Sequence, residues 1–340
     1  MKVTWPSAEY DSIIEQILEK LNKARNIFTI AHPYTDGDAL GSELALYHYC
    51  KATGKNCVVL NFEPVPEQLS WLKGYEICTD KLPEDVDFDL AILMETTEAR
   101  RMGDRVELFK RAKTTVHLDH HINVNGLGHI NLMDEKASST CEILYNILEK
   151  TGVELPKACR EALYVGIMTD TGNFRYNNST SRAHEVIAKI LGNDLDVDAI
   201  YKVVYENTSF NRVKVHGFTM ARTQAYANGK IVSSWLKLED FERLGASDVD
   251  ADGAIRNLSC INGIEIALLF KENPDNKVKV SLRSTGNIDV MAIAKQFQGG
   301  GHILAAGVTL EGCMEEVQKK IIGACEKAIK EFEAEKRING

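Results

Sequence analysis

The sequence predicts an α/β protein: a parallel sheet with helices on both faces, then a helical linker and a smaller C-terminal α/β domain. Three observations support this prediction. The 340 residues exceed the usual size of a single domain. In the first half, short apolar runs alternate with helical segments, as expected for a parallel sheet that is buried on both faces. The second half instead contains two strands around a turn.

The first half supplies four predicted strands. Ser7 stands where it can cap an opening helix, whose apolar residues recur at helical spacing from Ile13 to Leu21. A second helix is predicted at 41–53. The strands are predicted at 27–31, 57–61, 90–94 and 114–118. This alternation indicates an open sheet whose strands all run in the same direction.

The later elements set the predicted domain boundary. Gly152 and Gly192 stand where glycines commonly end helices. We therefore predict domains at 1–192 and 221–340, joined by a helical linker at 193–220. Helices are predicted at 137–152, 156–170, 180–192, 289–297 and 314–336, a strand at 230–238 and a hairpin at 261–284.

Composition narrows the class of protein. The formal net charge of −9 disfavours an extended basic track for long nucleic acid. Eight cysteines without a C-x-x-C pair indicate buried reduced thiols, with a zinc site as the minor alternative. The first residues lack the apolar core of a signal peptide, and no run approaches the ~20 apolar residues of a membrane span. We expect a cytoplasmic protein that does not cross a membrane.

Acidic and imidazole side chains follow the ends of predicted elements in four separate segments. These residues are His32, Asp36 and Asp38; Glu95; Asp119, His120 and His121; and Asp170. In an open parallel sheet, the carboxyl ends of the strands border one crevice, where ligands bind. The sequence therefore predicts that the four segments meet at one site.

The residue types in this set favour a metal site. Carboxylates with two or three imidazoles and no thiolate suit Mn²⁺, Mg²⁺ or Co²⁺. There are enough ligands for two ions, which can share a bridging hydroxide and hold a phosphoryl group. Each piece also has a simpler interpretation: an Asp-Gly-Asp sequence is usually a turn, a His pair after a strand is commonly structural, and Asp170 could cap the next segment. The joint arrangement favours the metal site.

The order of the motifs carries a resemblance to a known family. HPYTDGD, LAILMETTEARRMGD, HLDHH and GIMTDTGNFR occur in this order, with ASSTCE at 137–142 and SLRS followed by QGGGHILAAG in the second half. The sequence resembles the DHH phosphoesterase family with its DHH-associated C-terminal domain, and is most similar to the nanoRNase type. That resemblance implies degradation of very short oligoribonucleotides and, in many members, dephosphorylation of 3′-phosphoadenosine 5′-phosphate.

The resemblance also implies a role for each residue of the set. One ion would be held by His32 and Asp36, the other by Asp38, His120 and Asp170, with Glu95 as the bridge. Asp119 would orient His120 from behind. His121 would lie near the substrate phosphate, as a polariser or as the proton donor to the leaving oxygen.

Glu95 departs from the family pattern, in which the bridging position is normally Asp. The glutamate side chain is one methylene longer, so its carboxylate must fold back to reach the same point. The departure would loosen one ion, change the preferred metal or slow the chemistry. The alternative is that Glu95 is displaced and a water completes the coordination.

The glycine-rich QGGGH segment is the candidate substrate site in the second half. Glycines allow backbone N–H groups to approach an anion, and an arginine can pair with phosphate. The simpler interpretation is a glycine turn with a structural histidine. The resemblance implies that Arg283, Gly300, Gly301, His302 and Arg101 bind substrate, although Arg101 could instead support its loop. Gln298 stands where many relatives have a fourth glycine, and His117, His129, His184 and His216 are interpreted as structural.

Together these features predict an enzyme that hydrolyses oligonucleotides of two to a few nucleotides. Two divalent ions would hold the bridging hydroxide, with Mn²⁺ as the preferred metal. The products would be 5′-mononucleotides, or AMP from 3′-phosphoadenosine 5′-phosphate. Relatives are often dimers, which makes a homodimer one candidate assembly, although the sequence itself does not decide the oligomeric state. The alternatives are a RecJ-like single-strand exonuclease, a manganese pyrophosphatase, and a nucleotide-binding protein with activity weakened by Glu95.

Overall fold

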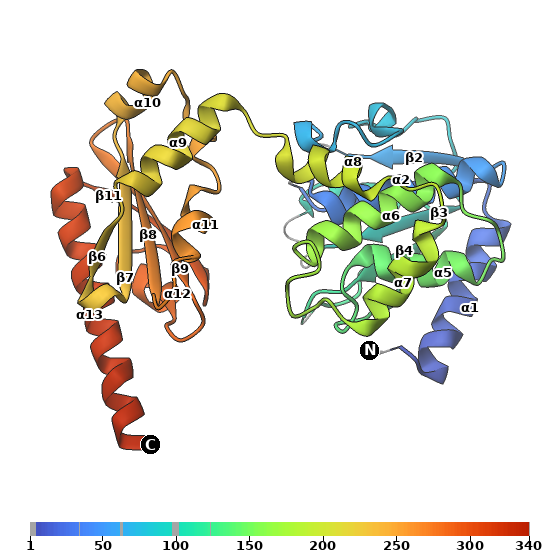
Figure 1. Ribbon diagram of the computed structural model, residues 1–340. Coiled ribbons are helices and arrows are strands. Elements are labelled where there is room, and N and C mark those ends of the chain that lie inside the picture. Colours follow the sequence, from blue (N-terminus) through green and yellow to red (C-terminus); the bar gives the residue numbers. More distant parts are fainter. Residues whose placement is uncertain (1–4, 34, 62–63, 97–101, 123, 340) are drawn as a thin grey trace. The chain divides into compact units, whose positions relative to one another are not determined.

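The computed structural model describes residues 5–33, 35–61, 64–96, 102–122 and 124–339 (Figure 1). The chain divides into two compact units, Met1–Asn207 and Thr208–Gly340. This division lies within the segment 193–220 that the sequence suggested as a linker. Among the helices of the described residues, none combines the length and the apolar character needed to cross a membrane.

The first unit is built on a five-stranded parallel sheet in the order β2-β1-β3-β4-β5. Its strands are β1 (Asn26–Ala31), β2 (Asn56–Leu60), β3 (Leu90–Met94), β4 (Thr114–Asp119) and β5 (Ile130–Met133). The predicted parallel sheet is confirmed, and β5 is an additional edge strand. Ala31 pairs with Met94, and Met94 pairs with Leu118. The strands therefore end together, and the residues that follow them share one edge.

Helices pack on both faces of this sheet. One face is covered by α1 (Ala8–Lys23), α2 (Gly37–Ala52), α5 (Thr140–Glu149), α6 (Lys157–Asp170) and α7 (Ser181–Leu191). Alternate residues of β3 divide between the faces: Ile92 and Met94 contact these helices, whereas Leu93 points the other way. There it packs with Phe28 and with Phe109 of α4 (Arg105–Phe109). Shorter elements are η1 (Glu67–Leu69), η2 (Tyr75–Ile77), α8 (Val197–Tyr201) and the π-helical turn η3 (Lys202–Glu206).

Side-chain caps fix where several of these helices begin. The Ser7 hydroxyl accepts a hydrogen bond from the Tyr10 N–H at 3.1 Å, as predicted for the first helix. The Asp36 carboxylate accepts from the N–H groups of Asp38 and Ala39. The helix predicted from residue 41 therefore begins earlier, at Gly37. Asp36 and Asp38 therefore lie at a helix N-terminus, where negative charge is favoured.

Glycines allow α6 to pack closely against α2 and α5. A Cβ on Gly41 of α2 would lie 2.6 Å from the Ala162 carbonyl oxygen of α6, and one on Gly166 of α6 would lie 2.2 Å from the Cys141 sulfur of α5. Both distances are far below van der Waals contact, so only glycine fits at these positions. The close approach brings the first turn of α2 beside the last turn of α6, which carry Asp38 and Asp170.

The second unit contains a six-stranded mixed sheet in the order β10-β11-β9-β8-β7-β6, in which only the β7–β8 pair is parallel. The predicted strand and hairpin are confirmed. Asp275 and Asn276 form the hairpin turn with φ of 65° and 56°. The strands are β6 (Gln224–Tyr226), β7 (Ile231–Leu236), β8 (Ile266–Asn273), β9 (Lys277–Ser284), β10 (Gly300–His302) and β11 (Ala305–Glu311).

Helices complete the second unit. Its elements are α9 (Phe210–Ala221), η4 (Ala227–Gly229), α10 (Leu238–Leu244), η5 (Asp248–Ala251), α11 (Ala254–Ser259), α12 (Val290–Lys295) and α13 (Met314–Asn339). Val317, Ile321 and Cys325 of α13 pack on one face of the sheet. Ile255 and Leu258 of α11 pack with Ala267 and Leu269 in a separate cluster. The long C-terminal helix was predicted, whereas α10, α11 and the strands β6, β10 and β11 were not.

The glycine contacts lead to a stability prediction. Gly41→Ala should lower the free energy of unfolding by roughly 1–3 kcal/mol, because the added methyl group overpacks the α2–α6 contact. The matched control is Gly323→Ala in α13, where a Cβ would meet no atom within 4 Å. That variant should gain roughly 0.5–1 kcal/mol from helix propensity. Denaturant unfolding measures both, and equal effects at the two positions would contradict the packing argument.

Candidate metal centre

Three groups of possible metal ligands lie at the carboxyl edge of the first sheet. They are His32, Asp36 and Glu95; Asp38, His120 and Asp170; and Glu95, His120 and His121. Within each group, one ligand atom per residue lies within 4.8 Å of the others. The structure thus brings together side chains from all four segments that the sequence singled out, although their metal-binding roles remain a proposal.

Glu95 is a member of the first group and also approaches the second. Its Oε2 atom is 3.8 Å from His32 Nε2, and its Oε1 atom is 3.8 Å from His120 Nε2. His32 Nε2 is also 3.6 Å from Asp36 Oδ2, and His120 Nε2 is 3.6 Å from Asp170 Oδ2. Glu95 thus directs one carboxylate oxygen toward each group, which is the placement required of a bridging ligand.

Asp38 is fixed by the N-terminus of α5. Its two carboxylate oxygens accept hydrogen bonds from the Thr140 N–H at 2.6 Å and the Cys141 N–H at 2.8 Å. These amide groups have no partner within a helix at its first turn, so they are available to hold an anion. Asp38 is 1% exposed. The segment ASSTCE therefore has a physical role, because it supplies the donors that hold this carboxylate.

Asn178 connects Asp170 to the same segment. Its side-chain Nδ2 donates to the Ser138 carbonyl oxygen at 2.9 Å and lies 3.4 Å from Asp170 Oδ2. Ser138 in turn donates its N–H and hydroxyl to the Glu142 carboxylate. Asp38 and Asp170, which belong to one candidate group, are thus both held by residues around the start of α5.

A buried arginine supports this segment from behind. Arg182 pairs with Asp134 through Nη1 at 2.6 Å and with Glu142 through Nε. Its guanidinium also lies over the rings of Tyr10 and Trp5. Because Asp134 and Glu142 flank the residues that hold Asp38, this charge network limits their movement.

The electrostatics of the cluster favour a bound cation. Burial, together with the nearby charges of Asp38, Asp36 and Asp170, raises the pKa of Glu95 well above its ordinary value. Burial and the charges of Asp38 and Asp36 raise the pKa of Asp170 to about 8. Burial also raises the pKa of Asp38. Repulsion of this kind disappears when divalent cations lie among the carboxylates.

Two buried atoms of the cluster fit the same interpretation. Glu95 Oε2 and His120 Nε2 have no hydrogen-bond partner among the described residues. Burial lowers the pKa of His120, so its imidazole is favoured in the neutral form that can ligate a metal. A backbone hydrogen bond to Ala137 orients this ring. Orphaned buried donors and acceptors are uncommon, and a metal ion satisfies both atoms at once.

Asp119 contacts His121, which corrects the expectation that it orients His120. Asp119 Oδ1 accepts from both the N–H and the Nδ1 of His121 at 2.8 Å. The chain turns directly after β4, which places residue 121 rather than 120 beside the carboxylate. Burial acts to raise the pKa of Asp119, but hydrogen bonds from His117 and His121 hold it below its usual range.

His117 is a residue that sequence reasoning missed. Its Nδ1 accepts from the Leu127 N–H at 3.2 Å, so its proton is on Nε2, which lies 3.5 Å from Asp119 Oδ2. The two residues are two apart on β4 and therefore share a face of the sheet. That spacing could have indicated the contact. Asn178 had no comparable indication in the sequence.

The predicted substrate residues of the second unit form a row across three strands. His302 on β10 pairs with Ala305 on β11, and Ala305 pairs with Arg283 on β9. Directly opposed residues share a face of a sheet, so Arg283 and His302 point to the same side. Gly300, Gly301 and His302 are exposed. Arg101, the remaining predicted substrate residue, lies outside the described residues.

The glycine loop, residues 298–302 including β10, has a backbone that explains its composition. Gly301 has φ of 141°, and a Cβ there would lie 2.4 Å from the Ala305 carbonyl oxygen. Gln298 has φ of 63°, a conformation that glycine adopts more readily. The position at which relatives often carry a fourth glycine is therefore a left-handed one in this chain as well.

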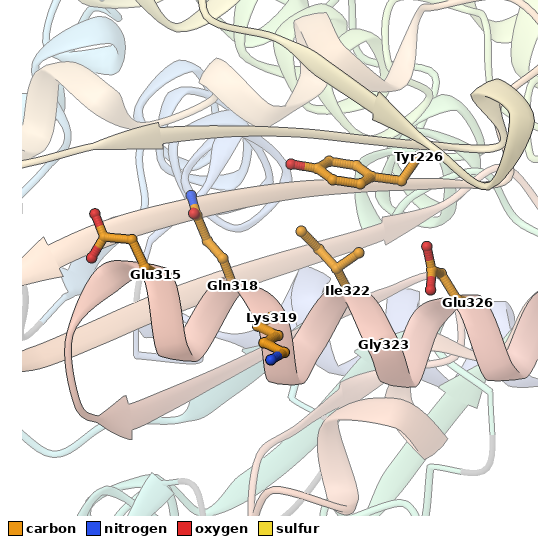
Figure 2. A pocket seen from close by; sticks show the side chains of 7 residues that line it. All are labelled: Tyr226, Glu315, Gln318, Lys319, Ile322, Gly323 and Glu326. Carbon is orange, nitrogen blue, oxygen red and sulfur yellow. The ribbon is translucent and has the colours of Figure 1, made fainter.

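A separate cavity of about 490 Å³ lies between Tyr226 and α13. Figure 2 shows the Tyr226 ring above Gln318 and Ile322, with Glu315 and Glu326 also lining the cavity. Two carboxylates disfavour an anionic ligand. The cavity contains none of the predicted metal or substrate residues, and we assign it no part in the chemistry.

Comparisons with known proteins agree with this geometry. The description "DHH family, N-terminal domain" matches residues 26–167, and "DHHA1 domain" matches residues 228–331. The first match contains most of the candidate metal ligands. The second contains the glycine loop and Arg283.

Relatives match over most of their length. A protein from Thermus thermophilus named "Bifunctional oligoribonuclease and PAP phosphatase NrnA" is 28% identical over 94% of this chain and 95% of its own. A Bacillus subtilis protein of the same name is 25% identical over 94% and 99%. The crystal structure of an exopolyphosphatase-related protein from Bacteroides fragilis has a TM-score of 0.84 and 26% identity, covering 97% of this chain and 100% of that one.

The raised pKa of Asp170 predicts how stability depends on pH without metal. The folded protein keeps a proton on Asp170 up to about pH 8, whereas the carboxyl group of an unfolded chain releases it near 3.8. The folded state therefore binds more protons, and the unfolding temperature should fall as pH rises through this window. Mn²⁺ should raise it most near pH 8.

The matched variant is Asp170→Asn, which removes the titrating group and should weaken both the pH dependence and the response to Mn²⁺. Differential scanning fluorimetry across pH, with and without Mn²⁺, measures these effects. An unfolding temperature that is flat or rising between pH 4 and 8, or a protein indifferent to Mn²⁺, would contradict the electrostatic argument.

The Asp119–His121 contact predicts an altered histidine titration. The hydrogen bond that His121 Nδ1–H donates to the Asp119 carboxylate raises the pKa of His121 in the metal-free protein. Asp119→Asn should return that pKa toward its ordinary value, because the carboxylate no longer stabilises the imidazolium. NMR titration of the histidine ring signals measures the change. His216 in the second unit is the internal control, and an unchanged His121 titration would show that the contact is not formed in solution.

Proposed function

Since the chain belongs to the DHH family, as its motifs predicted, and carries a DHHA1 domain in its second unit, we propose that it is a metal-dependent phosphoesterase acting on short oligonucleotides. The observation that carries this proposal is the convergence of carboxylates and imidazoles from four segments around Glu95. No thiolate belongs to these groups, which favours Mn²⁺, with Mg²⁺ and Co²⁺ as the alternatives.

The grouping of ligands supports two ions. His32 and Asp36 would hold one ion, Asp38, His120 and Asp170 the other, and Glu95 would lie between them. Bound ions of this kind activate water for attack on phosphorus and neutralise the charge that develops on the phosphoryl oxygens. The protein contributes the orientation of the ligands through the α5 amides and Asn178.

His121 is the candidate proton donor to the leaving oxygen. Its Nδ1 is held by Asp119, and its side chain is 38% exposed. The ring therefore keeps one orientation while Nε2 stays available to a substrate. Asp119 stabilises the protonated ring, and protonation is required of a group that donates a proton as the phosphoester bond breaks.

The names of the relatives support the choice of substrate. They name oligoribonuclease and PAP phosphatase activity, and their chains match this one over nearly their whole length. We propose cleavage of dinucleotides and slightly longer oligonucleotides to 5′-mononucleotides, and of 3′-phosphoadenosine 5′-phosphate to AMP and phosphate. The activity named for these relatives favours this proposal over that of a RecJ-like exonuclease.

The second unit is the proposed source of substrate contacts. Arg283 and His302 lie in one row of the sheet beside the exposed residues Gly300 and Gly301. An arginine beside an exposed glycine backbone is suited to a phosphate. A contribution from Arg101, a homodimer and a cytoplasmic location remain predictions from the sequence.

Turnover of a labelled RNA dinucleotide tests the proposal. With Mn²⁺ the protein should release 5′-mononucleotides, and removal of the metal with a chelator should stop the reaction. Asp38→Asn should lower kcat/KM by roughly 10²-fold or more, because it removes a ligand and leaves the α5 amides without their anion.

The control is Asp275→Asn in the hairpin turn of the second unit, which alters one carboxylate away from the candidate ligands. It should keep full activity. Dinucleotide binding without turnover would favour the alternative of a nucleotide-binding protein weakened by Glu95. An absence of both binding and turnover would overturn the proposal.

A further inference from the structure

The segment after Asp170 contains an unusual left-handed turn. Gly172, Asn173 and Phe174 have φ values of 57°, 58° and 61°. Only glycine adopts this conformation without cost, and a bulky residue such as phenylalanine is a genuine outlier. Strain of this kind persists where the surroundings enforce it, and it is concentrated at functional sites.

Local contacts hold the turn in place. The Thr171 carbonyl oxygen accepts hydrogen bonds from the N–H groups of both Arg175 and Tyr176, at 3.0 and 2.9 Å. Thr171 itself is fully buried. The Phe174 ring packs against the rings of Tyr164 and His184. The turn is therefore anchored by its first residues and by Phe174, while the next two side chains point outward.

Tyr176 presents an aromatic face in the loop that follows the candidate metal ligand Asp170. Its side chain is 49% exposed. A Cβ on Gly172 would lie 2.4 Å from the Tyr176 ring, so the ring rests directly on the glycine two residues after Asp170. A side chain at position 172 would displace the ring. Glycine is thus required at position 172 for two reasons: the backbone is left-handed there, and the Tyr176 ring occupies the space of a side chain.

Arg175 extends this surface. Its guanidinium lies 5.3 Å from the centre of the Tyr176 ring, within cation–π distance. In the described part of the chain, no carboxylate forms an ion pair with Arg175. An exposed aromatic ring beside an unneutralised guanidinium is the combination on which nucleobases stack.

The loop that carries Arg175 and Tyr176 is connected to the candidate metal ligand Asp170 at both of its ends. The turn begins next to Asp170, and Asn178, two residues after Tyr176, returns to Asp170 Oδ2 at 3.4 Å. The Tyr176 N–H and carbonyl oxygen are both engaged within this loop. The Tyr176 ring and the candidate ligand Asp170 thus belong to one short loop that starts at Asp170 and returns to it.

We propose that Tyr176, with Arg175, is a stacking site for one nucleobase of the substrate. This inference rests on the proposed function, since it requires a nucleotide at the metal centre. Stacking accepts every base because each has a flat π face, so the site would bind without sequence preference. It would also distinguish a nucleotide from a simple phosphoester.

Two substrates separate base stacking from catalysis. With Tyr176→Ala, KM for an RNA dinucleotide should rise roughly tenfold, the scale of one lost base–aromatic stack, with kcat little changed. With a dinucleotide analogue that lacks both bases, the variant and the parent protein should have equal kcat/KM. Tyr176→Phe should preserve the parent KM for the dinucleotide, because the ring face remains.

The matched control is Tyr75→Ala, which removes another exposed tyrosine of the same unit, 38% accessible, from η2. It should leave KM unchanged. An unaltered dinucleotide KM in Tyr176→Ala, or an equal loss on the analogue without bases, would overturn the stacking site.

A binding measurement tests the stacking site independently of whether the protein is a phosphoesterase. The Mn²⁺-loaded protein should quench the fluorescence of 2-aminopurine riboside 5′-monophosphate by stacking, and Tyr176→Ala should abolish the quench. If the protein hydrolyses no dinucleotide but Tyr176-dependent quenching occurs, the phosphoesterase proposal fails and the stacking site stands. Quenching that persists in Tyr176→Ala would contradict the stacking site.

Discussion

Carboxylates from α2, from the end of β3 and from α6 converge where little water reaches them, and their mutual repulsion must be offset for the site to keep its shape. Asp38 and Glu95 are 1% and 2% exposed. The protein opposes part of this repulsion with the amide groups of α5 and with neutral or partly charged imidazoles. The rest of the negative charge of the carboxylates is not compensated by the protein, and divalent cations are suited to neutralise it.

The scaffold reflects this constraint. Ordinary helix packing would separate α6 from α2 and α5 by the width of their side chains, whereas Gly41 and Gly166 remove that width. The same approach places Gly166 beside Asp38, where a Cβ would lie 3.0 Å from a carboxylate oxygen. Close packing and close charges therefore have the same cause. Arg182 and its acidic partners then brace the segment that supplies the amides, at some distance from the ligands themselves.

Much of this arrangement was predictable because it depends on position along strands. Apolar runs indicate where parallel strands end, and residues after those ends must meet, as His32, Glu95 and His120 do. The contacts of Asn178 depend instead on how its loop returns to Asp170 and Ser138, which no periodic pattern encodes. The strands β10 and β11 were missed for a related reason: β10 is short and glycine-rich, and glycine weakens the pattern that identifies a strand.

Non-glycine residues with positive φ are a second indication of where the functional sites are. The non-glycine residues of the described chain with positive φ are Glu95, Asn173, Phe174, Ala227, Asn228, Asp275, Asn276 and Gln298. Four of these are in tight turns beside strands of the second unit, where such values are ordinary. The other four lie in or beside the candidate metal ligands or the glycine loop. Glu95 is the most informative, because its unusual side chain and its unusual backbone coincide. A residue directly after a strand would normally continue extended, and the left-handed value turns the chain there, while Oε1 and Oε2 remain directed to the two ligand groups. The glutamate is thus accommodated by the local backbone, and its extra length need not separate the two halves of the site.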